Sequence, residues 1–324
     1  ETSADPRLAI GRTLGGRVLE IGPGHVPFPT HPSASVTFAD RPVPGGRDAT
    51  WPELVGQPHG PDADIEIDLD LEGLAPVAEG AFDAVVAAHV VEHLANPLRA
   101  VQEMERVIAP GGRLVLIVPD RRRTFDAVRE PTPTRHVLDD FERGTAEVDA
   151  EHIHEFCRAI FDQPPIHPDH VRAWYDPSRL DGELLALHRR RTIHVHCWDP
   201  QEFAVLLAAA AEGGIVTSVL EDLYFCDDRG AEPGNEFGLV LRRPHHPAER
   251  HGAGARLVAS WVELVLGRPD HDPRRVGALL AVLLGTVGEE PSLEPAVAAL
   301  GRALGRFAPP ASKRRRALRR AVPG

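Results

Sequence analysis

Cysteine is scarce in this sequence. The chain of 324 residues has three cysteines, Cys157, Cys197 and Cys226, which are too few and too scattered for a disulfide framework. Proteins without a disulfide framework are typical of reducing compartments. We therefore expect a cytoplasmic location.

The chain also lacks a hydrophobic run long enough to cross a bilayer. The longest, near Val276–Val287, contains two glycines and is shorter than the roughly 20 residues that a membrane-spanning helix needs. The first residues show no basic segment followed by an apolar one, the pattern of a secretory leader. The chain starts at Glu1 without a methionine, so an N-terminus that has been trimmed remains an alternative. We expect no membrane partner.

Positive charge is sparse outside the C-terminus. The chain has 36 basic and 48 acidic residues, a net charge of −12. Without a basic tail near the C-terminus, 30 basic and 48 acidic residues remain, a net charge of −18 that repels nucleic acid. We therefore expect a small-molecule substrate and no nucleic-acid partner, and we interpret the tail as a solvated segment. The tail contains Lys313, Arg314, Arg315, Arg316, Arg319 and Arg320.

The most informative stretch is Arg17–Gly24. Its apolar core, Val18–Ile21, has the pattern of a buried parallel strand, and it ends at Gly22 and Gly24. Glycine lets bare backbone approach a ligand, so a nucleotide-like molecule at the end of this strand is the hypothesis. Position 27 is proline where a dinucleotide fingerprint has its third glycine, which argues against NAD, FAD or ATP.

Further strand patterns alternate with helix patterns, which predicts a parallel sheet. Asn96 and Pro97 start one predicted helix, and Asp199 starts another with capping-box spacing to Glu202. The later predicted strands are Ser35–Asp40, Asp64–Asp68, Phe82–Ala87, Arg113–Val118, Ile215–Phe225 and Phe237–Leu241.

Several of these residues occur in an order that resembles a known family. The set Val18–Gly24, Asp40, Asp68, Phe82–Leu94 and Pro110–Leu114 is similar to class I S-adenosylmethionine-dependent methyltransferases, the small-molecule methyltransferases included. The resemblance implies a Rossmann-like seven-stranded mostly parallel sheet with helices on both faces. It also implies S-adenosylmethionine as cofactor and S-adenosylhomocysteine as product.

The segments around that core complete the expected organisation. We assign 1–244 to the methyltransferase domain, with a substrate-side insertion over 121–199 after the fifth strand. Residues 245–324 form a predicted helical C-terminal extension with the basic tail, which would cover the sheet or form the contact of a homodimer.

Carried over position by position, the resemblance implies a cofactor site. Asp40 also follows Glu20 by twenty residues, about where a carboxylate accepts ribose hydroxyls in a doubly wound sheet; the alternative is a turn-forming aspartate. The implied residues are Glu20 at the methionine ammonium, Gly22 and Gly24 along the cofactor, Asp40 at the ribose, Asp68 and Leu69 at the adenine, and His89 near the methyl group.

The insertion supplies candidates for catalysis. His194 and His196 lie two residues apart in an extended segment, so both imidazoles are expected on one side, at the mouth of the cofactor pocket. Either would take the proton of a hydroxyl acceptor, with Trp198 as an apolar wall. The alternative is a pair of histidines hydrogen-bonded to backbone. Arg121 and Arg123 are candidates for binding an anionic substrate group, or else belong to a solvated charge run.

A metal site is the remaining alternative for the histidines. His152 and His154, with His194, His196 and Cys197, have zinc-type ligand chemistry, but their spacing matches no standard finger. We therefore predict no metal. The preferred function is methyl transfer to a hydroxyl of a natural-product or sugar-like molecule. The alternatives are N-methylation of an amino sugar or amine, a non-catalytic subunit that binds the cofactor, and a metal-dependent hydrolase.

Overall fold

The computed structural model describes most of the chain up to residue 279. The basic tail and most of the expected C-terminal helical extension lie outside the described residues. The described residues are 5–43, 45–46, 50–51, 55–56, 59–161, 163, 172–229, 234–246, 253–267 and 274–279.

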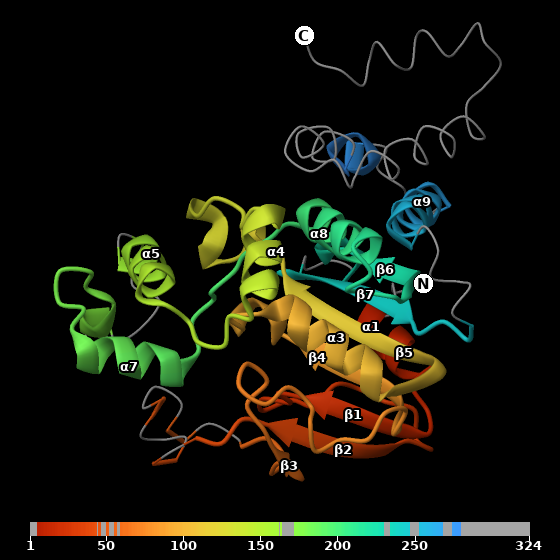
Figure 1. Ribbon diagram of the computed structural model, residues 1–324, viewed down its shortest axis with the longest axis horizontal. Helices are drawn as coiled ribbons and strands as arrows, with labels where there is room; N and C mark the ends of the chain where they lie inside the picture. The colour runs from red at the N-terminus through yellow and green to blue at the C-terminus, as the bar shows by residue number, and fades with distance from the viewer. Residues whose placement is uncertain are drawn as a thin grey trace, which may run out of the picture.

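A single seven-stranded sheet forms the centre of the protein (Figure 1). The strand order is β3-β2-β1-β4-β5-β7-β6, and all neighbours are parallel except the pairs made by β7. This confirms the expected fold class, including the antiparallel final hairpin. The strands are β1 (Arg17–Ile21), β2 (Ser35–Asp40), β3 (Ile65–Glu66), β4 (Phe82–Ala88), β5 (Ile108–Pro119), β6 (Val219–Tyr224) and β7 (Glu236–Arg242).

The carboxyl ends of the first strands meet at one edge of the sheet. Ile21 of β1 is in register with Ala39 of β2 on one side and Ala87 of β4 on the other. The chain order reverses across β1, and the crevice at such a switch point is where open α/β sheets bind ligands. The residues that follow these strands, Gly22 and His89 among them, therefore come together in space.

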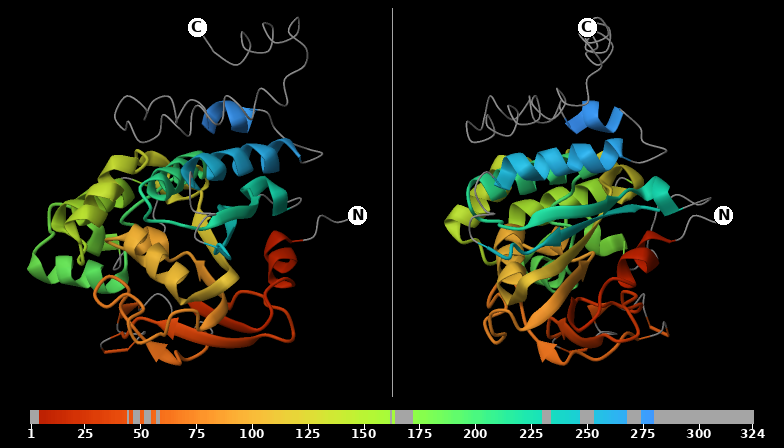
Figure 2. Two further views of the ribbon diagram at one scale, coloured as in Figure 1. Left: turned by 45° about the vertical axis from the view of Figure 1, so that its right-hand side comes forward. Right: turned by 90° about the vertical axis from the view of Figure 1, so that its right-hand side faces the viewer.

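Helices cover both faces of the sheet, as expected. The helix α1 (Pro6–Gly11) and the helix α3 (Pro97–Val107) lie on opposite sides of the strands in the left-hand view of Figure 2. Alternate residues of β4 divide between the two cores: Val85 packs toward α3, and Val86 packs toward α1. Period-two alternation of this kind is what a strand buried on both faces requires.

Two predicted helix starts are confirmed. The Asn96 side chain accepts a hydrogen bond from the Arg99 N–H at the start of α3. Asp199 and Glu202 form a capping box at the start of the helix α8 (Pro200–Glu212). The helix α9 (Ala253–Leu266), in the part of the chain assigned to the C-terminal extension, packs its buried side chains into the same core as α8.

The insertion after β5 folds into helices around a small core of its own. Its buried side chains include Ile153, Phe156 and Tyr175, and Figure 1 shows it on the left, where β1 and β2 end. The described helices are η3 (Arg121–Arg123), η4 (Phe125–Val128), α4 (Thr134–Arg143), α5 (Ala150–Phe161), η5 (Ala173–Tyr175) and α7 (Gly182–Arg191). Among the described residues, no helix combines the length and apolarity that crossing a membrane requires.

Candidate active site

A cavity of about 420 Å³ opens at the carboxyl ends of β1, β2 and β4. Its volume falls within the range of small-molecule sites. His93 and Thr192 close one side, and Trp51 belongs to its wall. The cavity is also lined by all but one of the residues expected to hold the cofactor, namely Gly22, Gly24, Asp40, Asp68, Leu69 and His89.

The turn after β1 needs its glycines. Gly22 and Gly24 have φ angles of 62° and 58°, a region that favours glycine. A Cβ on Gly22 would lie 3.0 Å from the Val90 side chain, so a larger residue there would also crowd its neighbour. The turn therefore presents backbone, without side chains, to the cavity.

Glu20 lies outside the cavity lining, which differs from the expected role at the methionine ammonium. Its side chain is 2% exposed, and Oε1 accepts a hydrogen bond of 2.7 Å from the Phe28 N–H. This bond anchors the proline-rich loop that follows Gly24 where many family members have a helix. Burial raises the pKa of Glu20 to about 7, against the opposing effect of the Phe28 hydrogen bond. Its other oxygen has no hydrogen-bond partner among the described residues.

The acidic residues after β2 and β3 face the cavity together. Asp40 is exposed, and its Oδ1 accepts a hydrogen bond of 2.7 Å from the Arg41 N–H. Asp68 Oδ1 accepts the Asp70 N–H at 3.0 Å. Asp70 in turn accepts the Ala95 N–H at 3.0 Å, and burial raises the pKa of Asp70 to about 6. Asp40 is therefore the carboxylate with room to accept hydroxyls from a ligand.

His89 is held between two carboxylates. Its Nε2 lies 2.8 Å from Glu236 Oε2, and its Nδ1 lies 3.6 Å from Glu92 Oε1. Burial alone would lower the pKa of His89, but the bonds to Glu236 and Glu92 raise it to about 9. Glu236 also accepts hydrogen bonds from Arg7 and from the Tyr224 hydroxyl. His89 is thus an imidazolium at neutral pH and does not serve as a base.

His93 lines the cavity, and its Nε2 lies 3.7 Å from the buried Glu92 Oε1. Its Nδ1 lies 2.9 Å from the Ile193 carbonyl oxygen, and a carbonyl only accepts, so Nδ1 carries the hydrogen. Burial lowers the pKa of His93, which keeps the ring neutral. Nε2 is therefore unprotonated, the form a general base needs.

The two histidines expected at the mouth of the cavity lie in different surroundings. His194 Nδ1 donates to Asp126 Oδ2 at 2.6 Å, and its ring lies edge-on to His93 with centroids 4.8 Å apart. His196 is fully buried and stacks on Trp198, with ring centroids 5.4 Å apart. Neither histidine lines the cavity. The backbone between them is not a regular strand, so the same-side argument for alternate residues does not apply.

The other expected substrate contacts also lie outside the cavity. Trp198 is 1% exposed and packs on Phe203 in the main core, so it is not a wall of the site. Arg121 donates to the Arg129 carbonyl oxygen at 2.9 Å, and Arg123 pairs with Asp227 at 2.8 Å. Both arginines are thus used in contacts within the protein.

Sequence reasoning did not place His93 at the cavity, and it missed the partners of His89. The notable omission is Glu236, which is 147 residues away from His89 in the chain. No local pattern marks Glu236, because it lies just before the predicted strand Phe237–Leu241 and carries no signal of its distant partner. The His93 tautomer likewise depends on a carbonyl a hundred residues away.

The fold and the cavity define a class of protein. A glycine turn after β1, carboxylates at the ends of β2 and β3 and a switch-point cavity are features of class I S-adenosylmethionine-dependent methyltransferase domains, and the cofactor of that class is S-adenosylmethionine. Residues 53–116 match the family model described as a methyltransferase domain.

Curated proteins resemble parts of the chain. An uncharacterised 37.1 kDa protein in transposon Tn4556 of Streptomyces fradiae is 34% identical over 83 residues, 23% of this chain and 23% of that protein. A ubiquinone biosynthesis O-methyltransferase of Xanthomonas oryzae pv. oryzae is 33% identical over 75 residues, 22% of this chain and 31% of that protein. The chain thus matches less than a third of the length of these relatives.

Solved structures align over more of the chain at lower identity. An S-adenosylmethionine-dependent methyltransferase from Methanosarcina mazei is 16% identical, with a TM-score of 0.37, over 74% of this chain and 98% of that one. A methyltransferase described as putative, from Bacillus halodurans, is 15% identical, also with a TM-score of 0.37, over 74% of this chain and 97% of that one.

Proposed function

We propose that this protein transfers the methyl group of S-adenosylmethionine to a small-molecule acceptor. The observation that carries the proposal is the switch-point cavity, in which a side-chain-free turn, the exposed Asp40 and the neutral His93 face one space. The matches to methyltransferase sequences support the same activity.

The residues present fit the cofactor. Asp40 offers carboxylate oxygens to ribose hydroxyls, and Leu69 and Asp68 offer an apolar and a polar contact for the adenine. The backbone of Gly22 and Gly24 leaves room for the amino-acid end, and the unpaired oxygen of Glu20 is an acceptor buried directly behind this turn. When bound, the cofactor supplies an electrophilic methyl group on a sulfonium.

An oxygen acceptor suits the histidine arrangement. A hydroxyl must lose its proton as it attacks, and we assign that proton to the neutral His93, which belongs to the cavity lining. His194 packs against the His93 ring and is itself oriented by Asp126, so we assign it a positioning role behind the base. The name of the O-methyltransferase relative agrees with an oxygen acceptor. The proposed acceptor remains a hydroxyl of a natural-product or sugar-like molecule.

An amine acceptor is the second candidate, since a neutral amine can attack without a base. A non-catalytic subunit that only binds the cofactor is the third. Methyl transfer to a hydroxyl should depend on His93, and transfer to an amine should not. The non-catalytic subunit should show no turnover at all.

Calorimetry with S-adenosylhomocysteine tests the cofactor site. We expect binding by the full chain and weaker binding by Asp40→Ala, because the ribose hydroxyls lose their acceptor. Unchanged affinity of Asp40→Ala would remove Asp40 from the site.

A methyl-transfer assay tests the activity itself. Labelled S-adenosylmethionine is offered with a panel of phenols, sugars, amino sugars and amines. Transfer to hydroxyl compounds supports the preferred function, and transfer confined to amines supports the second candidate. Cofactor binding without transfer to any member supports the non-catalytic subunit.

A further inference from the structure

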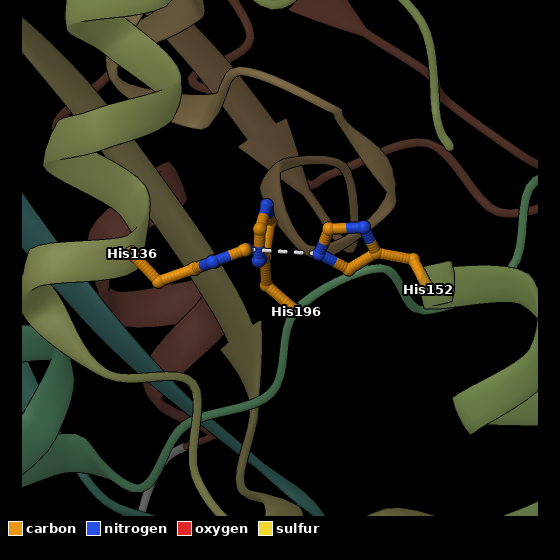
Figure 3. Close-up of side chains that lie close together, drawn as sticks. All are labelled: His136, His152 and His196. Atoms are coloured by element: carbon orange, nitrogen blue, oxygen red, sulfur yellow. Dashed lines mark hydrogen bonds between the residues drawn. The ribbon is translucent and has the colours of Figure 1, made fainter. Parts of the chain in front are cut away.

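A cluster of three histidines lies in the insertion, outside the lining of the cofactor cavity. His136 comes from α4, His152 from the first turn of α5 and His196 from the segment before α8, and Figure 3 shows their rings converging. One nitrogen from each lies within 4.8 Å of the others. The cluster thus brings together three histidines that are far apart in the chain: His152 follows His136 by sixteen residues, and His196 follows His152 by forty-four.

The contacts within the cluster leave hydrogen-bonding groups unsatisfied. His196 is fully buried, and neither of its ring nitrogens has a hydrogen-bond partner of acceptable geometry among the described residues. A buried polar nitrogen without a partner is costly, so it calls for a ligand. Protonation of all three rings cannot satisfy these nitrogens, because neighbouring imidazolium ions repel one another.

His152 has the tautomer that a metal ligand requires. Its Nδ1 lies 2.9 Å from Asp149 Oδ1, and a carboxylate accepts, so Nδ1 carries the hydrogen and Nε2 is a bare lone pair. This Nε2 points at His136 Nε2, 2.9 Å away, as the dashed line in Figure 3 marks. A carboxylate behind a histidine is the usual arrangement around protein metal ions.

Asp140 adds an oxygen beside the His136 nitrogen. Its Oδ2 lies 3.2 Å from His136 Nε2 and is buried without a hydrogen-bond partner among the described residues. Its Oδ1 is held by Arg143 at 2.9 Å and by Thr145 at 3.1 Å. The second oxygen is therefore directed at the cluster by bonds that do not use it.

We propose that His136, His152 and His196 bind a divalent first-row metal ion, zinc foremost. Three imidazoles suit zinc, and a tetrahedral ion about 2.0–2.1 Å from each nitrogen holds the nitrogens roughly 3.3 Å apart. The 2.9 Å separation of His136 and His152 needs only a small adjustment to reach that value. For His136 to bind the ion through Nε2, its ring hydrogen moves to Nδ1, so the ring stays neutral and no net proton is released.

We infer a structural role for the site, because its ligand His196 is shielded from solvent. It ties α4 and α5 to the segment that precedes α8. The same segment carries the Ile193 carbonyl that orients His93. Ligand atoms of Glu92, His93 and His194 also lie within 4.8 Å of one another, but His93 belongs to the cavity wall and Glu92 is paired with His89.

Metal analysis of the full chain tests this site directly. After incubation with zinc and removal of the excess, we expect about one tightly held zinc ion per chain, released by a strong chelator with a fall in Tm that added zinc restores. His152→Ala should lose the ion. His154→Ala is the matched control, because His154 is on the same helix, two residues away, and outside the cluster, so it should keep the ion.

A milder variant keeps the test independent of folding defects. Asp149→Asn retains an acceptor oxygen but removes the carboxylate behind His152, so zinc affinity should fall about 10–100-fold, measured by competition with a chelating dye. The proposal is overturned if the chain holds no stoichiometric zinc, cobalt or nickel, if His154→Ala loses the ion as His152→Ala does, or if Asp149→Asn binds zinc as the wild type does. None of these measurements depends on methyl transfer.

Discussion

A hydrogen bond and burial together keep the His93 imidazole neutral at the cavity. Its Nδ1–H is committed to the Ile193 carbonyl, and burial lowers its pKa. His89, only four residues earlier, has the opposite state, because Glu236 and Glu92 stabilise its charged form. Two histidines on one wall therefore differ in charge, and we propose His93 as the base and His89 as a fixed charge.

The His93→Gln variant tests the base. Glutamine can still donate to the Ile193 carbonyl but accepts no proton, so kcat for a hydroxyl acceptor should fall about 10²–10⁴-fold. Affinity for S-adenosylhomocysteine should stay unchanged in calorimetry. His31→Gln is the control, since His31 is exposed and outside the cavity. Wild-type turnover by His93→Gln would exclude His93 as the base.

Glu20 gives a pH dependence of stability with a definite sign. Its pKa rises from the ordinary value of 4.5 to about 7 in the folded chain, so the folded state binds its proton more tightly. The free energy of unfolding contributed by Glu20 is therefore highest below pH 4.5 and falls as pH rises to about 7. Relative to Glu20→Gln, the wild type should lose on the order of 3 kcal/mol over that window.

Denaturant unfolding of both proteins between about pH 5 and pH 8 measures this difference. The Gln variant keeps an oxygen for the Phe28 N–H and lacks the titration. If the two stability curves run parallel across the whole range, Glu20 does not titrate as the burial requires.

Among the helices, α8 has a start that the local sequence specifies clearly. Asp199 accepts the N–H groups of Gln201 and Glu202, and Glu202 accepts the Asp199 N–H in return. Asp199→Ala should lower the free energy of unfolding by about 1 kcal/mol, as measured by urea denaturation. Asp199→Asn keeps a capping oxygen, so its free energy of unfolding should fall clearly less than that of Asp199→Ala. Equal losses in the two variants would mean that the cap does not stabilise α8.

The loop after β1 is the element that departs most from the family pattern. Three prolines, Pro27, Pro29 and Pro32, prevent a helix there, and a buried carboxylate anchors the loop at Phe28 instead. The sequence did not indicate the use of Glu20, because the bond joins a strand residue to a backbone N–H that only the folded loop presents.

At the scale of the whole molecule, the sheet was predictable and the insertion was not. Short apolar runs, glycine stops and helix caps are local, so they indicate the strands and α8 directly. The sets His93–Ile193, His89–Glu236 and His136–His152–His196 join residues far apart in the chain, and no local pattern specifies such pairs. Trp198 illustrates the same limit, since its burial depends on Phe203 and His196 together.

At the scale of the whole chain, the cavity predicts that the protein binds S-adenosylhomocysteine and not NAD. S-adenosylhomocysteine at about a hundred times its Kd should add about 2.7 kcal/mol to the free energy of unfolding and raise Tm. NAD at the same concentration should leave Tm unchanged, because the turn after β1 is not followed by a helix that could bind a pyrophosphate. Thermal unfolding with each ligand checks this, and equal shifts would contradict it.

The most direct measurement is a crystal structure of the full chain with S-adenosylhomocysteine. We predict the nucleoside in the crevice between β1 and β4, with the ribose hydroxyls within about 3 Å of the Asp40 carboxylate and the sulfur facing His93. A ligand bound elsewhere on the protein, or one whose ribose makes no contact with Asp40, would contradict the account.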